Sequence, residues 1–262
     1  MIEPLGTQLW ADIRWRNGWR VQRRWSGDVA RVLDPAGRTV CRGRTAECER
    51  TLARSAPEPT EAAHLVVLLH GLGRTRRSLA GLDDALRSAG FSTVRLDYPS
   101  TRRTIEEHAS VVADLLDHIP RPVRLSFVGH SLGALITRQL FAYDRPWRAS
   151  AARVVMLAPP NQGASLAASL DKAGLLRKVL GPSFGQIADG VAARLPVPSA
   201  SFAIFAGNAL GASGDGLLRV EETRLDGMQE HVVVPAIHTF IMDHPDVIRG
   251  VLSFLRTAPD GG

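Results

Sequence analysis

The stretch Val123–Ile136 reads Val-Arg-Leu-Ser-Phe-Val-Gly-His-Ser-Leu-Gly-Ala-Leu-Ile. Its first half is rich in apolar residues, as expected of a strand, and its second half has the apolar spacing of an amphipathic helix. The glycines at 129 and 133 permit a sharp turn from strand to helix. Ser131 stands at the apex of that turn, where the helix N-terminus behind it favours developing negative charge. The stretch therefore predicts a reactive serine on a strand–turn–helix unit.

Apolar strands alternate with amphipathic helices on both sides of this unit. This alternation is typical of an α/β fold, a mostly parallel sheet flanked by helices. Thr104 and Glu107 form a capping-box pattern, while Asp243 and Asp246 suit the cap and first turn of the last helix. The predicted strands are His64–Leu69, Phe91–Leu96, Val123–Val128, Arg153–Leu157, Phe202–Phe205 and Val232–Val234. The predicted helices are Ser78–Ala89, Thr104–His118, Leu132–Ala142 and Pro245–Leu255.

Residues 159–199 interrupt the alternation with about forty residues rich in Ala and Leu. A bare loop of that length is uncommon in a compact domain. The spacing of the leucines indicates short helices, so we expect a helical lid with an apolar inner wall. The alternative is a helical cover that only buries the edge of the sheet.

The N-terminal segment has a different composition. The 262 residues carry 32 Lys and Arg against 26 Asp and Glu, a net charge of +6. Residues 1–54 hold eleven Arg against six Asp and Glu, which accounts for +5 of that charge, and four of the five Trp. We expect a small antiparallel β appendage over residues 1–56 and the larger domain over 57–262, with a linker at Ser55–Thr60.

Two registers are open for the hairpin around Asn17-Gly18. A two-residue turn places Trp15 opposite Arg20 and sends the apolar side chains to both faces. A three-residue loop, Arg16–Gly18, pairs Trp15 with Trp19 and Ile13 with Val21. We favour the three-residue loop because it gives one apolar face, which we expect to pack on the larger domain. A third strand over Ala30–Leu33, a turn at Asp34–Gly37 and a helix over Ala46–Ala53 capped by Thr45 complete the appendage.

The Arg and Trp side chains of the appendage have two interpretations. They suit contact with phosphate or an anionic membrane surface, or Arg stems packed over Trp rings in a small sheet. We favour packing and expect no nucleic-acid partner, and we leave weak membrane association open. Cys41 and Cys48 lie near each other in the predicted appendage, and we expect two reduced thiols.

Several classes of protein are excluded by composition. No run approaches the ~18 apolar residues of a membrane span, and the N-terminus lacks the layout of a signal peptide. We therefore expect a cytoplasmic location. The chain has no CxxC motif or Cys/His cluster, so neither a metal nor another cofactor is expected.

Further motifs follow other predicted strands. His70-Gly71-Leu72-Gly73 follows the first, Ala158–Gly163 reads Ala-Pro-Pro-Asn-Gln-Gly, Gly214–Leu218 reads Gly-Asp-Gly-Leu-Leu, and His238-Thr239-Phe240 follows the last. With Gly-His-Ser-Leu-Gly, these resemble the lipase and esterase branch of the α/β-hydrolases over about residues 62–257. The resemblance implies an oxyanion loop at the first motif, a lid after the second, the acid in the third and the histidine in the fourth.

A serine hydroxyl needs a general base within hydrogen-bond reach to act as a nucleophile. The chain order Ser, acid, His of this fold leaves three C-terminal histidines. His231 precedes the last strand, at the wrong end of the sheet, and His244 begins a helix, whose dipole disfavours an imidazolium. We favour His238 as the base, with His244 as its rival. Asp215 is the favoured acid because it lies after the strand Phe202–Phe205 and has a glycine on each side. The other candidates are Asp171, Asp189, Glu221, Glu222 and Asp226.

The remaining site residues follow from the same resemblance. The backbone N–H groups of Leu72 and Leu132 are expected to form the oxyanion hole. His70, Gly71, His130 and Pro160 are expected to line the substrate site, although the two histidines also suit a packing role. The leading hypothesis is hydrolysis of an apolar carboxylic ester or lipid through an acyl-serine intermediate. Acyl transfer by the same triad and a non-catalytic binding protein are the alternatives.

Overall fold

The computed structural model describes residues 8–58, 61–120, 122–171, 174–211 and 214–257. Their centre is a six-stranded sheet in which each neighbouring pair of strands is parallel. In spatial order its strands are β10 (Glu230–Val234), β9 (Ser201–Gly207), β8 (Ala151–Leu157), β7 (Arg124–His130), β5 (His64–Leu69) and β6 (Ser92–Leu96). All six predicted strands are therefore present, with small shifts at their ends.

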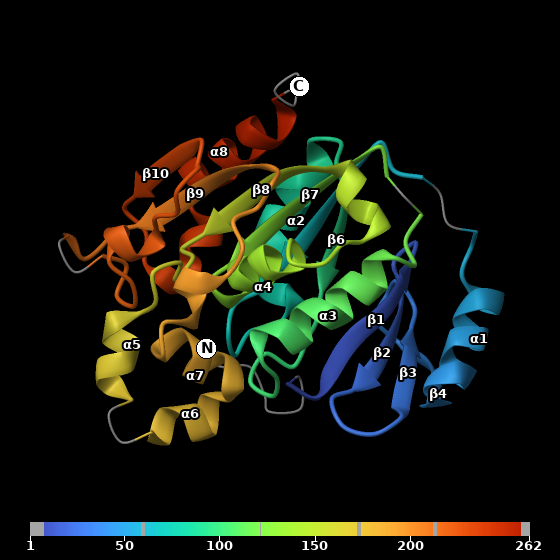
Figure 1. Ribbon diagram of the computed structural model, residues 1–262. Helices are drawn as coiled ribbons and strands as arrows, with labels where there is room; N and C mark the ends of the chain where they lie inside the picture. The colour runs from blue at the N-terminus through green and yellow to red at the C-terminus, as the bar shows by residue number, and fades with distance from the viewer. Residues whose placement is uncertain (1–7, 59–60, 121, 172–173, 212–213, 258–262) are drawn as a thin grey trace.

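Helices cover both faces of this sheet (Figure 1). α3 (Ile105–Leu116) and α4 (Leu132–Leu140) pack together on one face, and α2 (Ala80–Ser88) and α8 (Pro245–Arg256) lie on the other. Burial on both faces explains why β5 is an unbroken apolar run, buried from Leu65 to Leu69. The structure confirms the predicted α/β fold with its flanking helices.

Two helix starts differ from the prediction. The predicted helix from Ser78 begins with a 3-10 turn, Arg76–Leu79, and becomes α-helical only at Ala80. The cap of α8 is His244, not Asp243, and the His244 Nδ1 accepts a hydrogen bond from the Asp246 N–H. By contrast, the capping box at Thr104 is present as predicted.

The insertion at residues 159–199 folds into short helices, which lie together below the sheet in the view of Figure 1. These are α5 (Ser165–Leu170), α6 (Leu175–Leu180), α7 (Pro182–Ala188) and the 3-10 turn Val191–Arg194. The fully buried Arg138 of α4 holds both ends of the insertion. Its guanidinium donates to Asn161 Oδ1 (3.0 Å), Ala192 O (2.9 Å) and Pro196 O (3.0 Å). Burial lowers the pKa of Arg138 to about 10, which leaves it a cation at neutral pH.

The N-terminal appendage is a four-stranded antiparallel sheet with one helix. Its elements are β1 (Trp10–Arg16), β2 (Trp19–Arg24), β3 (Val29–Leu33), β4 (Thr39–Arg44) and α1 (Thr45–Ser55). β4 has no apolar alternation and was not predicted. The predicted cap of α1 was wrong, because Arg44 is the N-cap and Thr45 is the first helical residue. Cys41 and Cys48 are free thiols with 3.8 Å between their Sγ atoms.

The favoured hairpin register was wrong. Trp15 pairs with Arg20 across a two-residue turn, in which Asn17 and Gly18 have positive φ angles of 47° and 84°. A bulge at Ile13 then shifts the register, so that Ile13 and Val21 share one buried cluster. α1 covers this cluster with Cys48 and Leu52, and its C-cap residue Ala56 joins them. The apolar face therefore packs mainly on the helix of the appendage itself, although Trp15 contacts the core of the larger domain.

A buried polar network joins the other face of the small sheet to the large one. Arg20 Nη1 donates to Asp12 Oδ2 (2.6 Å) and to Arg95 O (2.8 Å). Asp12 Oδ2 also accepts from the Asp97 N–H (2.7 Å). Burial raises the pKa of Asp12, while Arg20 acts in the opposite direction. Because these contacts cross residue 56, the division of the chain there stays a prediction; residues 59–60 of the expected linker lie outside the described ranges.

We expect Asp12→Ala to lower the free energy of unfolding by about 3–5 kcal/mol, because the buried Arg20 cation loses its carboxylate. The control is Arg38→Ala. Arg38 is 80% exposed in its pair with Asp34, and such a pair contributes about 0–1 kcal/mol. Urea unfolding of both variants measures the difference. Equal losses would contradict a structural role for the network.

His108 makes stability depend on pH. It is buried on α3 against the Tyr98 ring, and burial lowers its pKa from 6.5 to about 3. Between these values the unfolded chain binds a proton that the folded chain does not, so stability falls as pH decreases. We expect His108→Gln to remove about 2 kcal/mol of the stability loss between about pH 7 and pH 5. His118→Gln, at an exposed histidine, is the matched control in urea unfolding at both pH values.

Candidate active site

Ser131, His238 and Asp215 meet at the carboxyl edge of the parallel sheet. His238 Nε2 lies 3.0 Å from Ser131 Oγ, and His238 Nδ1 lies 2.7 Å from Asp215 Oδ2. The other carboxylate oxygen, Oδ1, accepts from the N–H groups of Leu217 (2.9 Å) and Leu218 (2.7 Å). His238 and Asp215 are buried and Ser131 is half-buried. The three residues thus form a continuous hydrogen-bonded chain from an accessible hydroxyl to a fixed carboxylate.

The turn at Ser131 is strained and leaves no space for side chains at its flanks. Ser131 has φ 53° and ψ −116°, a conformation that a non-glycine residue rarely adopts. A Cβ on Gly129 would lie 2.5 Å from Ala134 N, and one on Gly133 would lie 2.2 Å from Leu69 O. Glycine at both positions therefore allows α4 to start directly against β7 and β5, with Ser131 above the sheet.

The loop after β5 lies against Ser131. A Cβ on Gly71 would come 3.4 Å from the Cβ of Ser131 and 2.8 Å from His130 Nδ1. Leu72 follows in this loop, and Leu132 is the first residue of α4, whose leading N–H groups lack intrahelical acceptors. The backbone groups predicted for an oxyanion hole thus belong to the two segments on either side of the serine.

The predicted substrate-binding residues have different surroundings. His70 is fully buried, and its ring stacks on Tyr98 with 4.0 Å between centroids, so we assign it to the loop interior and not to substrate contact. His130 is also buried, and its Nε2 donates to the His238 carbonyl (3.0 Å). Burial and the neighbouring His238 lower the pKa of His130 well below its usual value, so it stays neutral. Pro160 is buried in the loop that enters α5.

The rival base and acids lie in other contacts. His244 caps α8, and His231 lies within β10, not before it, where its Nε2 contacts Thr223 Oγ1 at 2.9 Å. Asp171 is paired with Arg177 at 2.6 Å. Glu222 Oε1 accepts from the Ser165 N–H at the start of α5. The structure therefore brings His238 and Asp215 to Ser131 and leaves these alternatives elsewhere.

Sequence reasoning missed a set of polar contacts behind the Gly71 loop. Ser100 Oγ accepts from the Gly73 N–H (2.9 Å) and donates to Gln8 Oε1 (2.9 Å). Gln8 Nε2 donates to Arg74 O (2.8 Å), and Gln8 is buried. The N-terminal segment thus fixes the loop from behind. Ser100 follows β6, so its place in the sequence could have indicated the sheet edge at which Ser131 lies. The residues around Gln8 contain no signal that Gln8 binds Ser100.

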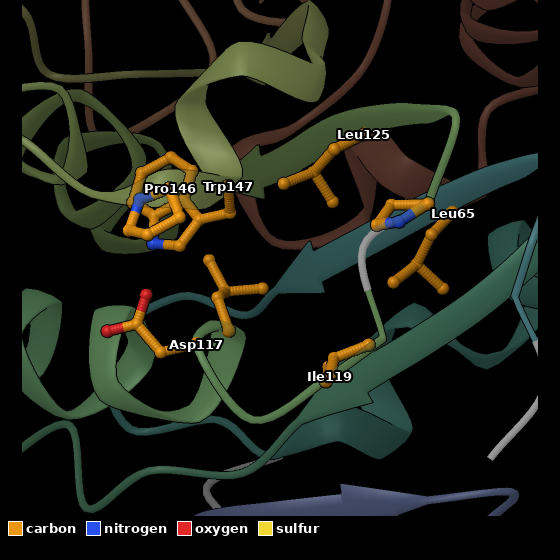
Figure 2. Close-up of a pocket in the computed structure, with 8 residues that line it drawn as sticks. Leu65, Asp117, Ile119, Leu125, Pro146 and Trp147 are labelled. Atoms are coloured by element: carbon orange, nitrogen blue, oxygen red, sulfur yellow. The ribbon is translucent and has the colours of Figure 1, made fainter.

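A cavity of about 370 Å³ lies at the opposite edge of the sheet. Leu65 and Leu125, near the amino ends of β5 and β7, point into it together with Trp147 (Figure 2). Because the strands are parallel, this cavity is remote from Ser131, which follows the carboxyl end of β7. Within the described ranges, no three His, Cys, Asp or Glu side chains converge as metal ligands would. None of the helices there combines the length and apolar character of a membrane span.

A model of the alpha/beta hydrolase family matches residues 66–251, which include the strand–turn–helix unit and His238. The chain belongs to this family. No curated protein sequence matches this alpha/beta hydrolase.

Solved structures share the fold at low sequence identity. The mature form of the lipase BlEst2 from Bacillus licheniformis has a TM-score of 0.58 and 15% identity, over 77% of this chain and 94% of the lipase. The metagenomic carboxyl esterase MGS0156 has a TM-score of 0.56 and 19% identity, over 77% and 79%. Phospholipase PlaB from Legionella pneumophila has a TM-score of 0.57 and 17% identity, over 74% and 60%. At such identities the similarity of this alpha/beta hydrolase to each concerns the fold alone.

Proposed function

We propose that the protein is a serine hydrolase that cleaves carboxylic esters with apolar acyl groups. The observation that carries the proposal is the chain of hydrogen bonds from Ser131 Oγ through His238 to Asp215. A binding protein needs only a pocket, whereas this arrangement activates a hydroxyl. Lipases and esterases among the proteins with this fold agree with the same chemistry.

The mechanism assigns one step to each group. Ser131 Oγ attacks the ester carbonyl carbon while its proton passes to His238 Nε2, and the carbonyl oxygen becomes an oxyanion. The N–H groups of Leu72 and Leu132 bind this oxyanion. His238 then gives the proton to the leaving alcohol as the C–O bond breaks, which leaves an acyl-serine. Water repeats the sequence and releases the acid.

Asp215 keeps the imidazole in the required tautomer. Its Oδ2 accepts a hydrogen bond from the Nδ1–H group, so that Nε2 faces Ser131 with a lone pair. The two backbone N–H groups that donate to Oδ1 hold the carboxylate in place while the imidazolium forms. His130 supports the same imidazole indirectly, since its Nε2 holds the backbone carbonyl of His238.

Apolar side chains near the triad favour an apolar substrate. Leu217, Ile237 and Phe240 flank Asp215 and His238 in sequence and are 46%, 41% and 53% exposed. Exposed apolar side chains beside catalytic residues are available for contact with an apolar ligand. With the Leu-rich insertion they support esters or lipids over charged substrates.

Ser131→Ala is expected to lower turnover of nitrophenyl esters at least ~10⁴-fold without unfolding the protein, because it removes only the nucleophile. A fluorophosphonate probe should label the wild type and not this variant. His238→Ala should have a comparable effect, and His244→Ala, the matched control, should keep turnover near wild type. Residual activity within tenfold in Ser131→Ala, or loss in His244→Ala alone, would contradict the assignment.

Gln8→Leu is expected to lower kcat about tenfold with little change in KM, because a loosened Gly71 loop binds the oxyanion less well. Ser100→Ala should act on the same contact, so the double variant should lose no more than either single variant. Gln139→Leu is the control, since that side chain makes no hydrogen bond within the described ranges. An equal loss in the control, or additive losses, would contradict this positioning role.

A further inference from the structure

A second pocket, separate from the triad, opens between the small sheet and the start of α2. Its volume is about 260 Å³, and three arginines line it: Arg31 of β3 and Arg76 and Arg77 of the 3-10 turn. Trp10 and Leu33 form apolar parts of the wall, and Asp97 contributes a carboxylate. We call this the basic pocket. None of the residues assigned to ester hydrolysis lines it.

The Arg31 guanidinium is fixed in the basic pocket without being neutralised. Its Nε and Nη2 donate to Gln22 Oε1 at 3.0 and 2.7 Å, and its central carbon lies 4.3 Å from the centroid of a Trp10 ring. Gln22 is itself buried and fixed, because its Nε2 donates to Asp12 Oδ1 (3.0 Å). A guanidinium oriented in advance by a neutral amide and an aromatic ring loses little entropy when an anion binds.

The charges of the basic pocket do not balance. Asp97 is already engaged by Arg76, through the Arg76 Nε (2.9 Å) and backbone N–H (2.9 Å). No acceptor binds the Arg77 guanidinium within the part of the chain that the structure describes. Three guanidinium groups and one carboxylate leave a formal excess of +2. Burial lowers the pKa of Arg31, while the carboxylates of Asp97 and Asp12 act in the opposite direction and do not offset it fully.

We propose that the basic pocket binds a dianionic phosphate group, carried by a small phosphomonoester or by a phospholipid headgroup. The charge of −2 matches the excess, and guanidinium groups bind phosphate oxygens with two parallel hydrogen bonds. Trp10 and Leu33 provide a wall for the organic part of the ligand. The proposal is independent of ester hydrolysis, because it rests on a different set of residues.

Calorimetric titration of the full chain with inorganic phosphate, at constant ionic strength set with chloride, tests the site. Arg31→Gln and Arg77→Gln should each weaken binding ~10-fold or more, since each removes a charged donor. Arg249→Gln makes the same charge change on α8, at a side chain that is 71% exposed, and should stay within twofold of wild type. Absence of phosphate binding, or equal weakening in the control, would overturn the proposal.

Two further measurements distinguish a soluble phosphomonoester from a phospholipid headgroup as the source of the phosphate. Glycerol 3-phosphate tests a soluble monoester, and cosedimentation with phosphatidylcholine vesicles, with and without phosphatidic acid, tests a headgroup. If glycerol 3-phosphate or the phosphatidic acid vesicles bind, and binding is lost in Arg77→Gln but kept in Arg249→Gln, the result supports the site and identifies the source of the phosphate. If neither probe binds, the proposal is overturned. Ester turnover should be unchanged in Arg77→Gln. Because Arg77 is exposed and unpaired within the described ranges, this variant is informative even if Arg31→Gln disturbs Gln22.

Discussion

The close approach of α4 to β5 and β7 is the constraint on which the rest of the structure depends. It exists only because positions 129 and 133 lack a Cβ, since any side chain there would overlap backbone atoms of Ala134 or Leu69. The approach forces Ser131 into a positive φ angle and raises its hydroxyl above the sheet. The packing of α3, α4 and the sheet core holds this strained residue in place, as strain at functional sites requires.

Sequence patterns predicted the strands and helices that are determined by residues within or next to them in the sequence. Short segments rich in apolar residues identified the strands of the large sheet, and the Thr104 capping box identified the start of α3. The order of strands along the chain also placed His238 and Asp215 at one edge, where hydrogen bonds now join them to Ser131. In each case the residues that decide the structure stand next to the element or at the end of a strand.

The hairpin register and the supports of the site were not predicted, because their causes lie far along the chain. The bulge at Ile13 turns Asp12 toward Arg20 and Gln22, and the partners that complete this buried network are Arg95 and Asp97 of the larger domain. Gln8 likewise acts through Ser100. Buried polar contacts of this kind fix how two segments pack together more than they add to the free energy of unfolding. The spacing of apolar residues along the sequence gives no information about such contacts.

Arg138 has a mechanical consequence for the helices of the insertion. One guanidinium holds Asn161 at the start of the insertion and Ala192 and Pro196 at its end, so both anchor points are attached to α4. α7 is held separately, because Ser183 Oγ donates to Arg103 O and Gln186 accepts from the Ile105 N–H at the start of α3. The insertion therefore cannot move away from the sheet as a whole without breaking both sets of contacts. Since the carbonyl acceptors of Arg138 are uncharged, pH changes near neutrality do not release its contacts.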